Sequence, residues 1–435
     1  MDIVSESGGG EARFNTYLDA LSMTLGHADR AAPFQAYCTG LLLPGDRKSV
    51  EPMAARLEPE RVQARHQSLH HLVAKAEWSD ETMLATVRSQ VLPAMERHGA
   101  INAWIVDDTG FPKKGAHSVG VARQYCGQLG KQDNCQVAVS LSVANDHASL
   151  PIAYRLYLPE AWADDPARRR KAGVPDDIAF RTKPQIALAQ IRAALLAGVA
   201  SAVVLADAGY GVDTEFRDGI TELGLRYVVG IQSSTMLWPP GQEPLPPKPW
   251  SGRGRRPTRL RHDDDHQPVS AKDLAIEQPN KAFRRVTWRE GSNTKLASRF
   301  AAVRVRPAQG DTSRSEPRAE EWCLIEWPKD AAEPTKYWFS TLPADTSLTA
   351  LVKQAKRRWR IERDYQDLKQ ELGLGHYEGR GWRGFHHHAT LCVAAYGFLI
   401  MERTAFPPSA ETQAPFVTPS PLPEGFRSRG SPGPA

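Results

Sequence analysis

The sequence predicts a mixed α/β fold with a helical N-terminal segment and a β-rich insertion. Three observations predict it. Residues 13–98 carry apolar side chains at helical spacing, without a strand pattern. Residues 100–233 alternate apolar runs with helical patterns in the order β-β-β-α-β-α-β. A Pro- and Gly-rich stretch begins at about residue 234, and short strand patterns follow it.

The helical pattern of the N-terminal segment has recognisable ends. The stretch RFNTYLDALSMTLGH places Phe14, Leu18 and Leu21 on one face of a helix. A later helix follows Ser79, a suitable N-terminal cap, and stops at Gly99. No strand pattern interrupts these helices, so we expect a helical domain.

Changes in composition divide the chain into six predicted segments. The insertion holds the strand patterns RRVTWREG, SRFAAVRVRP and EWCLIEWP, and KYWFSTLP returns to a core-like strand. The predicted segments are a disordered N-terminus (1–12), a helical domain (13–99), the first part of the α/β core (100–233), the β-rich insertion (234–335), the last part of the core (336–405) and a disordered tail (406–435).

The composition is that of a globular protein. The 435 residues are 41% hydrophobic and 24% charged, and no run approaches the 18 apolar residues of a membrane span. The polar N-terminus MDIVSESGGGEARF lacks the features of a signal peptide. Five scattered cysteines form no CxxC pair. We therefore expect a cytoplasmic protein without a membrane association, a disulfide framework or a zinc site.

Basic residues cluster although the net charge is only +5. One cluster is the run from Arg168 to Lys171. The other lies in the insertion and consists of Arg253, Arg255, Arg256, Arg259 and Arg261. Such clusters suit a polyanion such as nucleic acid. The alternative is a basic loop without a partner.

Two apolar runs end in aspartates. IVDDTGF ends at Asp107 and Asp108, and VLADAGY ends at Asp207. Aligning the D-T-G-F and D-A-G-Y tails pairs Asp108 with Asp207. Ligands gather where strands of an open α/β sheet end. The alternative for each residue is an aspartate that starts a turn before glycine.

A third carboxylate stands in the charged helix RRWRIERDYQDLK. At about 100° per residue, Arg358, Glu362 and Lys369 fall within about 40° of one another. Apolar residues beside them indicate that the helix packs on the sheet. The alternative is a solvated Arg358–Glu362 surface pair. Two aspartates and a glutamate are hard oxygen ligands of the kind that Mg²⁺ or Mn²⁺ prefers. A pair of such ions can activate a water or a 3′-hydroxyl at a phosphodiester.

The stretches IVDDTGFPKKGAHSVGVARQYCGQLGKQDNCQVAVSL, VVLADAGYG and RRWRIERDYQDLKQELGL resemble bacterial insertion-sequence transposases of the DDE superfamily. The resemblance covers residues of about 100–400, on the branch with a β-rich insertion. It implies a ribonuclease-H-like core with two Mg²⁺ ions, or Mn²⁺ as a substitute. It also implies binding to terminal inverted repeats by the helical domain, DNA cleavage, transfer of 3′ ends to target DNA, and a homodimer in the DNA complex.

The resemblance also assigns residues. The family has a Tyr-Arg-Glu-Lys signature, in which Arg358, Glu362 and Lys369 match and Ala355 occupies the tyrosine position. The metal ligands are then Asp108, Asp207 and Glu362. Asp108 is preferred to Asp107 because the family aspartate precedes a threonine, as Asp108 does here. Neighbouring strand residues face opposite sides, so only one of the two aspartates should face the metals.

Further DNA contacts are expected in the insertion. The family can stack a tryptophan from this region on a flipped base. The candidates are Trp288, Trp322, Trp327 and Trp338, with Trp288 and Trp338 preferred. The alternative for each of them is a residue that packs in the core. Arg253, Arg255 and Arg256 would suit backbone phosphates. A solvated loop is the interpretation of HDDDH (262–266), and helix capping and packing that of the His386–His388 run.

Two other functions fit the same residues. One is a transposase remnant that binds DNA without cutting it. The other is a ribonuclease-H-like nuclease that cuts DNA without joining it.

Overall fold

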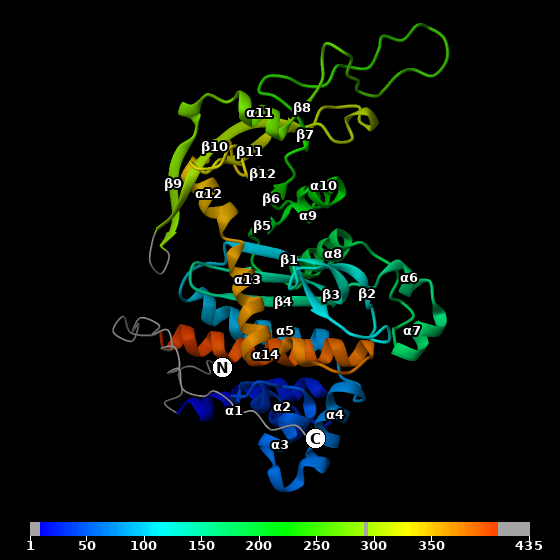
Figure 1. The fold of residues 1–435 in the computed structure, drawn as a ribbon, viewed down its shortest axis with the longest axis vertical. Coiled ribbons are helices and arrows are strands. Elements are labelled where there is room, and N and C mark those ends of the chain that lie inside the picture. The colour runs from blue at the N-terminus through cyan, green and yellow to red at the C-terminus, as the bar shows by residue number, and fades with distance from the viewer. Residues whose placement is uncertain (1–8, 291–294, 408–435) are drawn as a thin grey trace, which may run out of the picture.

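The computed structural model describes residues 9–290 and 295–407. Figure 1 shows the insertion at one end of the long axis, the core sheet in the middle and the N-terminal helices at the other end. The segments predicted to be disordered lie largely outside the described residues, although α1 already begins at Gly10. In the part of the chain that is described, no helix has the length and apolar character needed to cross a membrane.

The N-terminal helices pack against the last helix of the chain. They are α1 (Gly10–Ser22), α2 (Ala31–Leu42), α3 (Val50–Leu57), α4 (Val62–Ala74) and α5 (Asp80–Glu96), and the last helix is α14 (Trp382–Ala405). The buried Tyr17 hydroxyl donates to the Ala394 carbonyl at 2.9 Å. Most residues of helix α14 are buried, on all sides of the helix, as expected of a helix in the core of a protein. One hydrophobic core therefore runs from the N-terminal helices to the sheet, across the boundary expected at residue 99.

The central sheet confirms the predicted mixed α/β class and is consistent with a ribonuclease-H-like fold. Its core strands lie in the order β4-β3-β1-β5-β6, with β5 parallel to both of its neighbours. These strands are β1 (Ala103–Pro112), β3 (Lys131–Ala144), β4 (Ser149–Leu156), β5 (Val203–Ala206) and β6 (Tyr227–Ile231). The short β2 (Ala122–Cys126) pairs with the first part of β3, so four strands precede the first core helix rather than three.

Three strands of the insertion lie where the sequence patterns predict them, namely β9 (Arg284–Glu290), β10 (Lys295–Pro307) and β11 (Glu321–Glu326). The short strands β7 (Met236–Trp238) and β8 (Val269–Ser270) and the helix α11 (Ala271–Glu277) precede them and were not predicted. Strand β12 (Lys336–Ser340) joins β11 to β6 by antiparallel pairing. The insertion therefore extends the core sheet and does not form a separate one.

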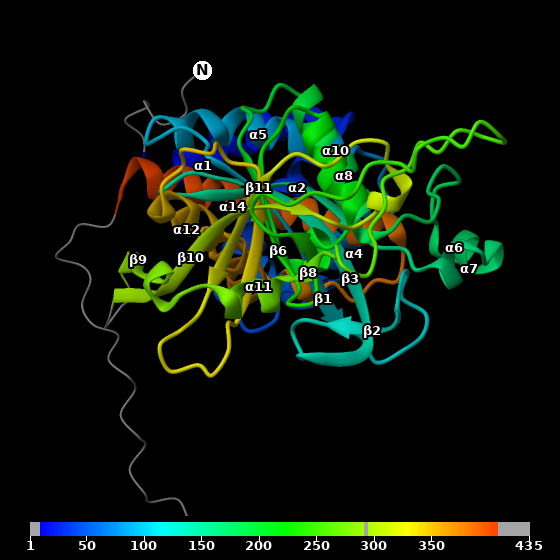
Figure 2. The ribbon, with the colours of Figure 1, turned by 90° about the horizontal axis from the view of Figure 1, so that it is seen from above.

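Helices cover both faces of the sheet (Figure 2). On one face lie α8 (Lys183–Leu196) and α10 (Thr214–Glu222), reached through the short α6 (Glu160–Ala163), α7 (Pro166–Ala172) and α9 (Ala208–Gly211). On the other lie α12 (Leu348–Lys356) and α13 (Trp359–Gln366). A π-helical turn (Asp367–Glu371) follows α13. The helix that carries Glu362 is thus bounded by a break from α12 at its N-terminal end and by the π-helical turn at its C-terminal end.

Candidate active site

Asp107 and Asp207 lie at matching positions of neighbouring parallel strands. The last backbone pair between β1 and β5 joins Ile105 to Leu205, and each aspartate lies two residues further along. Adjacent strands are about 4.8 Å apart. The two carboxylates are therefore neighbours at the carboxyl end of β5, where ligands of α/β sheets gather.

Two glycines allow the turn that holds Asp207 to pack on β6. A Cβ atom at Gly211 would lie 1.9 Å from the carbonyl oxygen of Gly230, and one at Gly230 would lie 2.7 Å from the nitrogen of Ala208. Asp207 caps the short α9 by accepting a hydrogen bond from the Gly209 nitrogen at 2.9 Å. Close backbone contact and capping together fix the position of this aspartate.

Asp108 faces away from this pair, so the geometry favours Asp107 over the preferred Asp108 as the residue that lies with Asp207. Asp107 follows Ile105 on the face covered by α12 and α13, whereas Asp108 follows Val106 on the opposite face. There the Lys183 ammonium from α8 lies 2.8 Å from the Asp108 carboxylate. The alignment of the D-T-G-F and D-A-G-Y tails matches the residues that follow the strands, whereas the register of the sheet, continued beyond the Ile105–Leu205 pair, matches Asp107 with Asp207.

Arg358 joins the first aspartate to the helix carboxylate. Its Nη1 lies 2.5 Å from Asp107 Oδ2, and its Nη2 lies 2.8 Å from Glu362 Oε1. The Arg358–Glu362 pair named as the alternative does form. The same guanidinium also bonds Asp107, however, so the pair belongs to a larger cluster of Asp107, Asp207, Arg358 and Glu362.

The electrostatics of the cluster follow from burial. Burial raises the pKa of Asp107 to about 7, and the Asp207 charge adds to this rise while Arg358 opposes it. Burial disfavours the charged form of Arg358, yet Asp107, Glu362 and Asp207 together raise the pKa of that guanidinium. Asp107 is thus a desolvated carboxylate whose charge needs a cation nearby.

The donor set suits a hard divalent cation, but the carboxylates do not converge as they stand. No group of three His, Cys, Asp or Glu side chains within residues 9–290 and 295–407 is placed to hold a metal ion. Arg358 lies between Asp107 and Glu362, and Glu362 is 61% exposed. Arg358 would have to release Glu362 before the three carboxylates could share an ion.

Lys369 does not lie with Arg358 and Glu362 as a continuous helix would place it. The π-helical turn that begins at Asp367 changes the helical spacing. The Lys369 ammonium donates to the Gly110 carbonyl at 2.8 Å and to Gln128 at 3.2 Å, and burial lowers its pKa to about 8. It therefore lies at the end of β1, beside the β2–β3 hairpin.

A cavity of about 480 Å³ adjoins the cluster, and we call it the carboxylate groove. Its lining includes Asp207, Arg358, Glu362, Trp288, Arg289, Trp338, Lys356 and Trp359. Both preferred tryptophans thus lie beside the carboxylates, and the Lys356 ammonium is 4.6 Å from the Trp288 ring centre and 5.2 Å from that of Trp338.

Sequence reasoning missed two further residues of the groove. The guanidinium of Arg289 lies 4.2 Å from the ring centre of Trp359. The signal for Trp359 was its position next to Arg358 within the signature stretch. The other two tryptophans are engaged elsewhere, because Trp322 donates to the Pro343 carbonyl and Trp327 to the Ala331 carbonyl.

The arginines predicted to bind phosphates in the insertion do not lie near the carboxylate cluster. Arg253, Arg255 and Arg256 lie exposed on the loop between β7 and β8, which extends from the far end of the insertion in Figure 1. Among the described residues, no ion pair or hydrogen bond involves these three side chains.

The two histidine-containing stretches have structural contacts. In the loop, His266 stacks on Trp238 at 4.8 Å. In α14, His387 bonds the Trp78 carbonyl and His388 bonds the Gly373 carbonyl. Neither stretch belongs to the carboxylate cluster.

Comparison with known proteins gives two findings. A family model described as "DDE superfamily endonuclease" matches residues 20–295, more than half of the chain. That range includes Asp107 and Asp207 but ends before Glu362. The chain is also 33% identical over 169 residues to the probable transposase for insertion sequence element IS701 of Microchaete diplosiphon. This match covers 39% of the chain and 41% of that relative, so the chain spans about two fifths of the relative's length.

Proposed function

The chain belongs to the DDE superfamily endonuclease family, and on that premise we propose that it is an insertion-sequence transposase. It binds the terminal inverted repeats of its element, cleaves the DNA there and transfers the 3′ ends to target DNA. The similarity to the probable IS701 transposase supports this proposal. In this proposal the protein cleaves and transfers DNA of the nucleoid in the bacterial cytoplasm.

One observation carries the proposal. Asp107 and Asp207 are register neighbours on parallel strands, and Arg358 connects Asp107 to Glu362. A simple structural ion pair would need only one carboxylate for the Arg358 guanidinium, whereas this cluster has three. A third carboxylate beside a buried one is costly unless further positive charge is bound. This cluster is therefore better explained as a cation site than as a structural ion pair.

Asp107, Asp207 and Glu362 would hold two Mg²⁺ ions, for which Mn²⁺ can substitute. Such ions supply Lewis-acid activation of the attacking water or 3′-hydroxyl and stabilise the leaving oxygen. The chain's own residues do the rest. The capped turn at α9 fixes Asp207, and β1 fixes Asp107. Arg358 exchanges Glu362 for a phosphate oxygen of the DNA, because a guanidinium binds phosphate as readily as carboxylate.

Other surfaces have supporting roles in the proposal. Lys369, at the end of β1, contacts a phosphate next to the scissile one. Trp288 and Trp338 stack on a base that leaves the duplex beside the carboxylate groove. Arg253, Arg255 and Arg256 bind backbone phosphates further along the DNA. The N-terminal helices recognise the element ends, and two copies act together because two ends must be cut.

The test is cleavage of DNA that carries the element ends, with Mg²⁺ present. We expect nicking by the wild-type protein and a loss of about a thousandfold or more in Asp207→Asn and in Glu362→Gln. Glu222→Gln, at an exposed position on α10, is the matched control and should cut normally.

The same assay separates the alternative functions. A DNA-binding remnant would bind the ends tightly and never cut them. A nuclease without a joining step would cut, but would not attach a pre-cut 3′ end covalently to target DNA. Unchanged nicking by both carboxylate variants would refute the catalytic assignment.

A further inference from the structure

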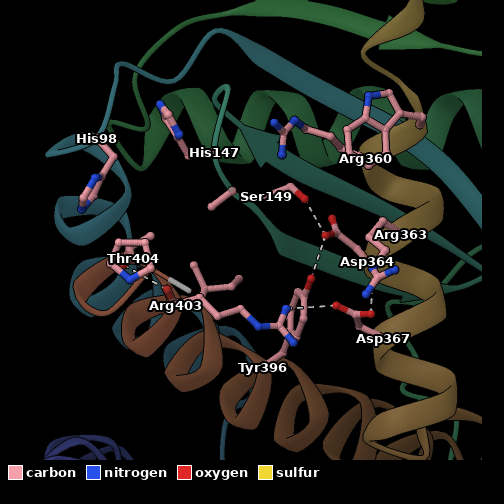
Figure 3. A pocket seen from close by; sticks show the side chains of 14 residues that line it. His98, His147, Ser149, Arg360, Arg363, Asp364, Asp367, Tyr396, Arg403 and Thr404 are labelled. Atoms are coloured by element: carbon pink, nitrogen blue, oxygen red, sulfur yellow. Dashed lines mark hydrogen bonds and ion pairs between the residues drawn. The ribbon is translucent and has the colours of Figure 1, made fainter. Parts of the chain in front are cut away.

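A second cavity lies on the other side of α13 from the carboxylate groove. It has a volume of about 560 Å³ and lies between α13, α14 and the β3–β4 connection (Figure 3). Glu362 lines the carboxylate groove, whereas Arg360 and Arg363 line the second cavity, and Trp359 borders both. One helix therefore separates the two spaces.

Basic side chains outnumber acidic ones around this cavity. Arg360, Arg363 and Arg403 face Asp364 and Asp367, and the imidazoles of His98 and His147 add to the lining. Both acidic groups make contacts within the protein, although Asp364 Oδ2 is buried without a hydrogen-bond partner among the described residues. Asp364 Oδ1 accepts hydrogen bonds from Ser149 at 2.5 Å and from Tyr396 at 3.0 Å, as the dashed lines in Figure 3 show.

Asp367 positions two of the arginines. Its side chain is only 6% exposed, with Arg363 Nε at 3.0 Å from one oxygen and Arg403 Nη1 at 3.1 Å from the other. Each guanidinium has five N–H donors. Within the described residues, no partner is seen for the remaining nitrogens of these two arginines, whose side chains are 57% and 52% exposed. Asp367 thus orients two arginine forks and leaves donors available to a ligand.

The third arginine adds positive charge that the protein balances poorly. Burial lowers the pKa of Arg360, and the neighbouring Arg357 lowers it further, although Asp364 and Asp146 oppose this. Arg357 and Arg360 both bond to Asp146, through its carboxylate and its backbone carbonyl. A bound anion would relieve the repulsion between these arginines.

We propose that this cavity binds a phosphate group of the DNA backbone, as a second DNA contact on the side of α13 opposite Glu362. The inference rests on the proposed function, since it concerns the same substrate. Planar guanidiniums held by a carboxylate are suited to bidentate phosphate binding. An α-helix with its side chains is about 10–12 Å across, so DNA held on both sides of α13 would clamp the helix that carries Glu362.

The experiment measures duplex DNA affinity of the full-length protein as a function of salt concentration. We expect Arg363→Gln/Arg403→Gln to bind about tenfold more weakly, with the slope of log K against log salt reduced by about 0.9 for one lost phosphate contact. Arg363→Lys/Arg403→Lys keeps the charge and should keep most of the slope. Thermal unfolding of each variant shows whether it is folded.

The matched control is Arg314→Gln/Arg318→Gln. These two arginines also bracket one aspartate, Asp218, which lies on α10 on the other face of the sheet. The control loses the same charge and should keep the wild-type slope. An equal loss in both double variants would mean a general charge effect and would overturn the proposal.

Two further outcomes separate the possible failures. If the wild-type protein cuts DNA while the Arg363/Arg403 variant keeps wild-type affinity and slope, the second contact is refuted and the proposed function stands. If inorganic phosphate stabilises the wild-type protein but not that variant, while DNA binding is equal in both, the cavity takes a free phosphate and the assignment to DNA is wrong. A protein that binds no DNA at all refutes the proposed function itself.

Discussion

Arg358 donates to Asp107 at 2.5 Å across 251 residues of sequence, and this contact connects the helix after the insertion to the first strand of the core. The same guanidinium bonds Glu362 at 2.8 Å. Arg358 therefore occupies the space between two of the three carboxylates proposed to hold metal ions. The structure has this side chain bonded to the carboxylates, and the proposed function adds a second state in which it bonds a DNA phosphate.

The two adjacent aspartates should differ in their effect on cleavage. Asp107→Asn should reduce Mg²⁺-dependent nicking about a thousandfold or more while DNA binding persists, because it removes a proposed metal ligand and keeps the side-chain shape. Asp108→Asn should retain cleavage within about tenfold, because Asp108 bonds Lys183 on the other face of the sheet. The opposite ranking of the two variants in a nicking assay would restore Asp108 as the metal ligand.

Divalent cations should stabilise the protein in the absence of DNA. A desolvated Asp107 beside Asp207 and Glu362 gains from a bound cation, so Mn²⁺ at about 100 times its Kd should add about 2.7 kcal/mol to the free energy of unfolding. Thermal unfolding with and without a chelator measures the effect. Asp108→Asn is the control and should respond like the wild type, whereas Asp107→Asn should not. An equal response in both variants would place the cation elsewhere.

The glycine contact beneath Asp207 should be essential. Gly211→Ala should lower the melting temperature by several degrees and reduce cleavage, because the new Cβ would lie 1.9 Å from the Gly230 carbonyl and push the turn away from β6. Gly127→Ala, at the tip of the β2–β3 hairpin with no atom within 4 Å of the new Cβ, is the matched control. If both variants melt and cut alike, the turn does not depend on that contact.

Features that depend on neighbouring residues could be predicted from the sequence, whereas features that depend on contacts between distant segments could not. Strand runs and the Glu362 helix are local patterns, and the sheet confirmed the predicted fold class. Which aspartate faces α13 depends on the register between β1 and β5, which no stretch of sequence contains. The departure of Lys369 depends on a π-helical turn, which ideal helical spacing cannot predict.

The second cavity likewise could not be predicted from the sequence, because its residues come from separate helices. Arg403 on α14 and Arg363 on α13 meet at Asp367, and only the packing of the two helices brings them together. The histidine run was easier to interpret, because three adjacent residues on a buried helix point in three directions.

His388 should make the protein sensitive to acid. Its Nε2 bonds the Gly373 carbonyl and its Nδ1 bonds the Tyr37 hydroxyl, and burial lowers its pKa to about 4. The unfolded chain takes up this proton near pH 6.5, so stability present above pH 6.5 is lost as the pH falls toward 4. The loss is at most roughly 3 kcal/mol from this residue.

The measurement for His388 is urea unfolding between pH 4 and pH 7. His388→Gln should be less stable than the wild type at pH 7 and should lose less stability on acidification. His117→Gln changes an exposed histidine and should follow the wild-type curve. Equal losses of stability in the wild type and in His388→Gln between pH 6.5 and 4 would show that His388 accepts a proton without cost.

Glu321 should have the opposite dependence on pH. It lies buried at the start of β11, where burial raises its pKa to about 7, while the Tyr227 hydroxyl at 2.7 Å and Arg217 partly oppose that rise. The folded protein therefore binds a proton that the unfolded chain releases near pH 4.5. Stability from this residue is greatest at low pH and declines as the pH rises through 7, by up to roughly 3 kcal/mol.

Glu321→Gln tests this, because glutamine keeps an oxygen that can accept from Tyr227 and carries no charge. The variant should be more stable than the wild type at pH 8, and this advantage should vanish near pH 5. Glu316→Gln changes an exposed glutamate of the preceding segment and should match the wild type at both pH values. Because Glu321 lies in the insertion, away from the carboxylate groove, the stabilised variant should still cleave DNA normally. A variant less stable than the wild type at pH 8 would mean that the ionised carboxylate is well compensated by the neighbouring arginines.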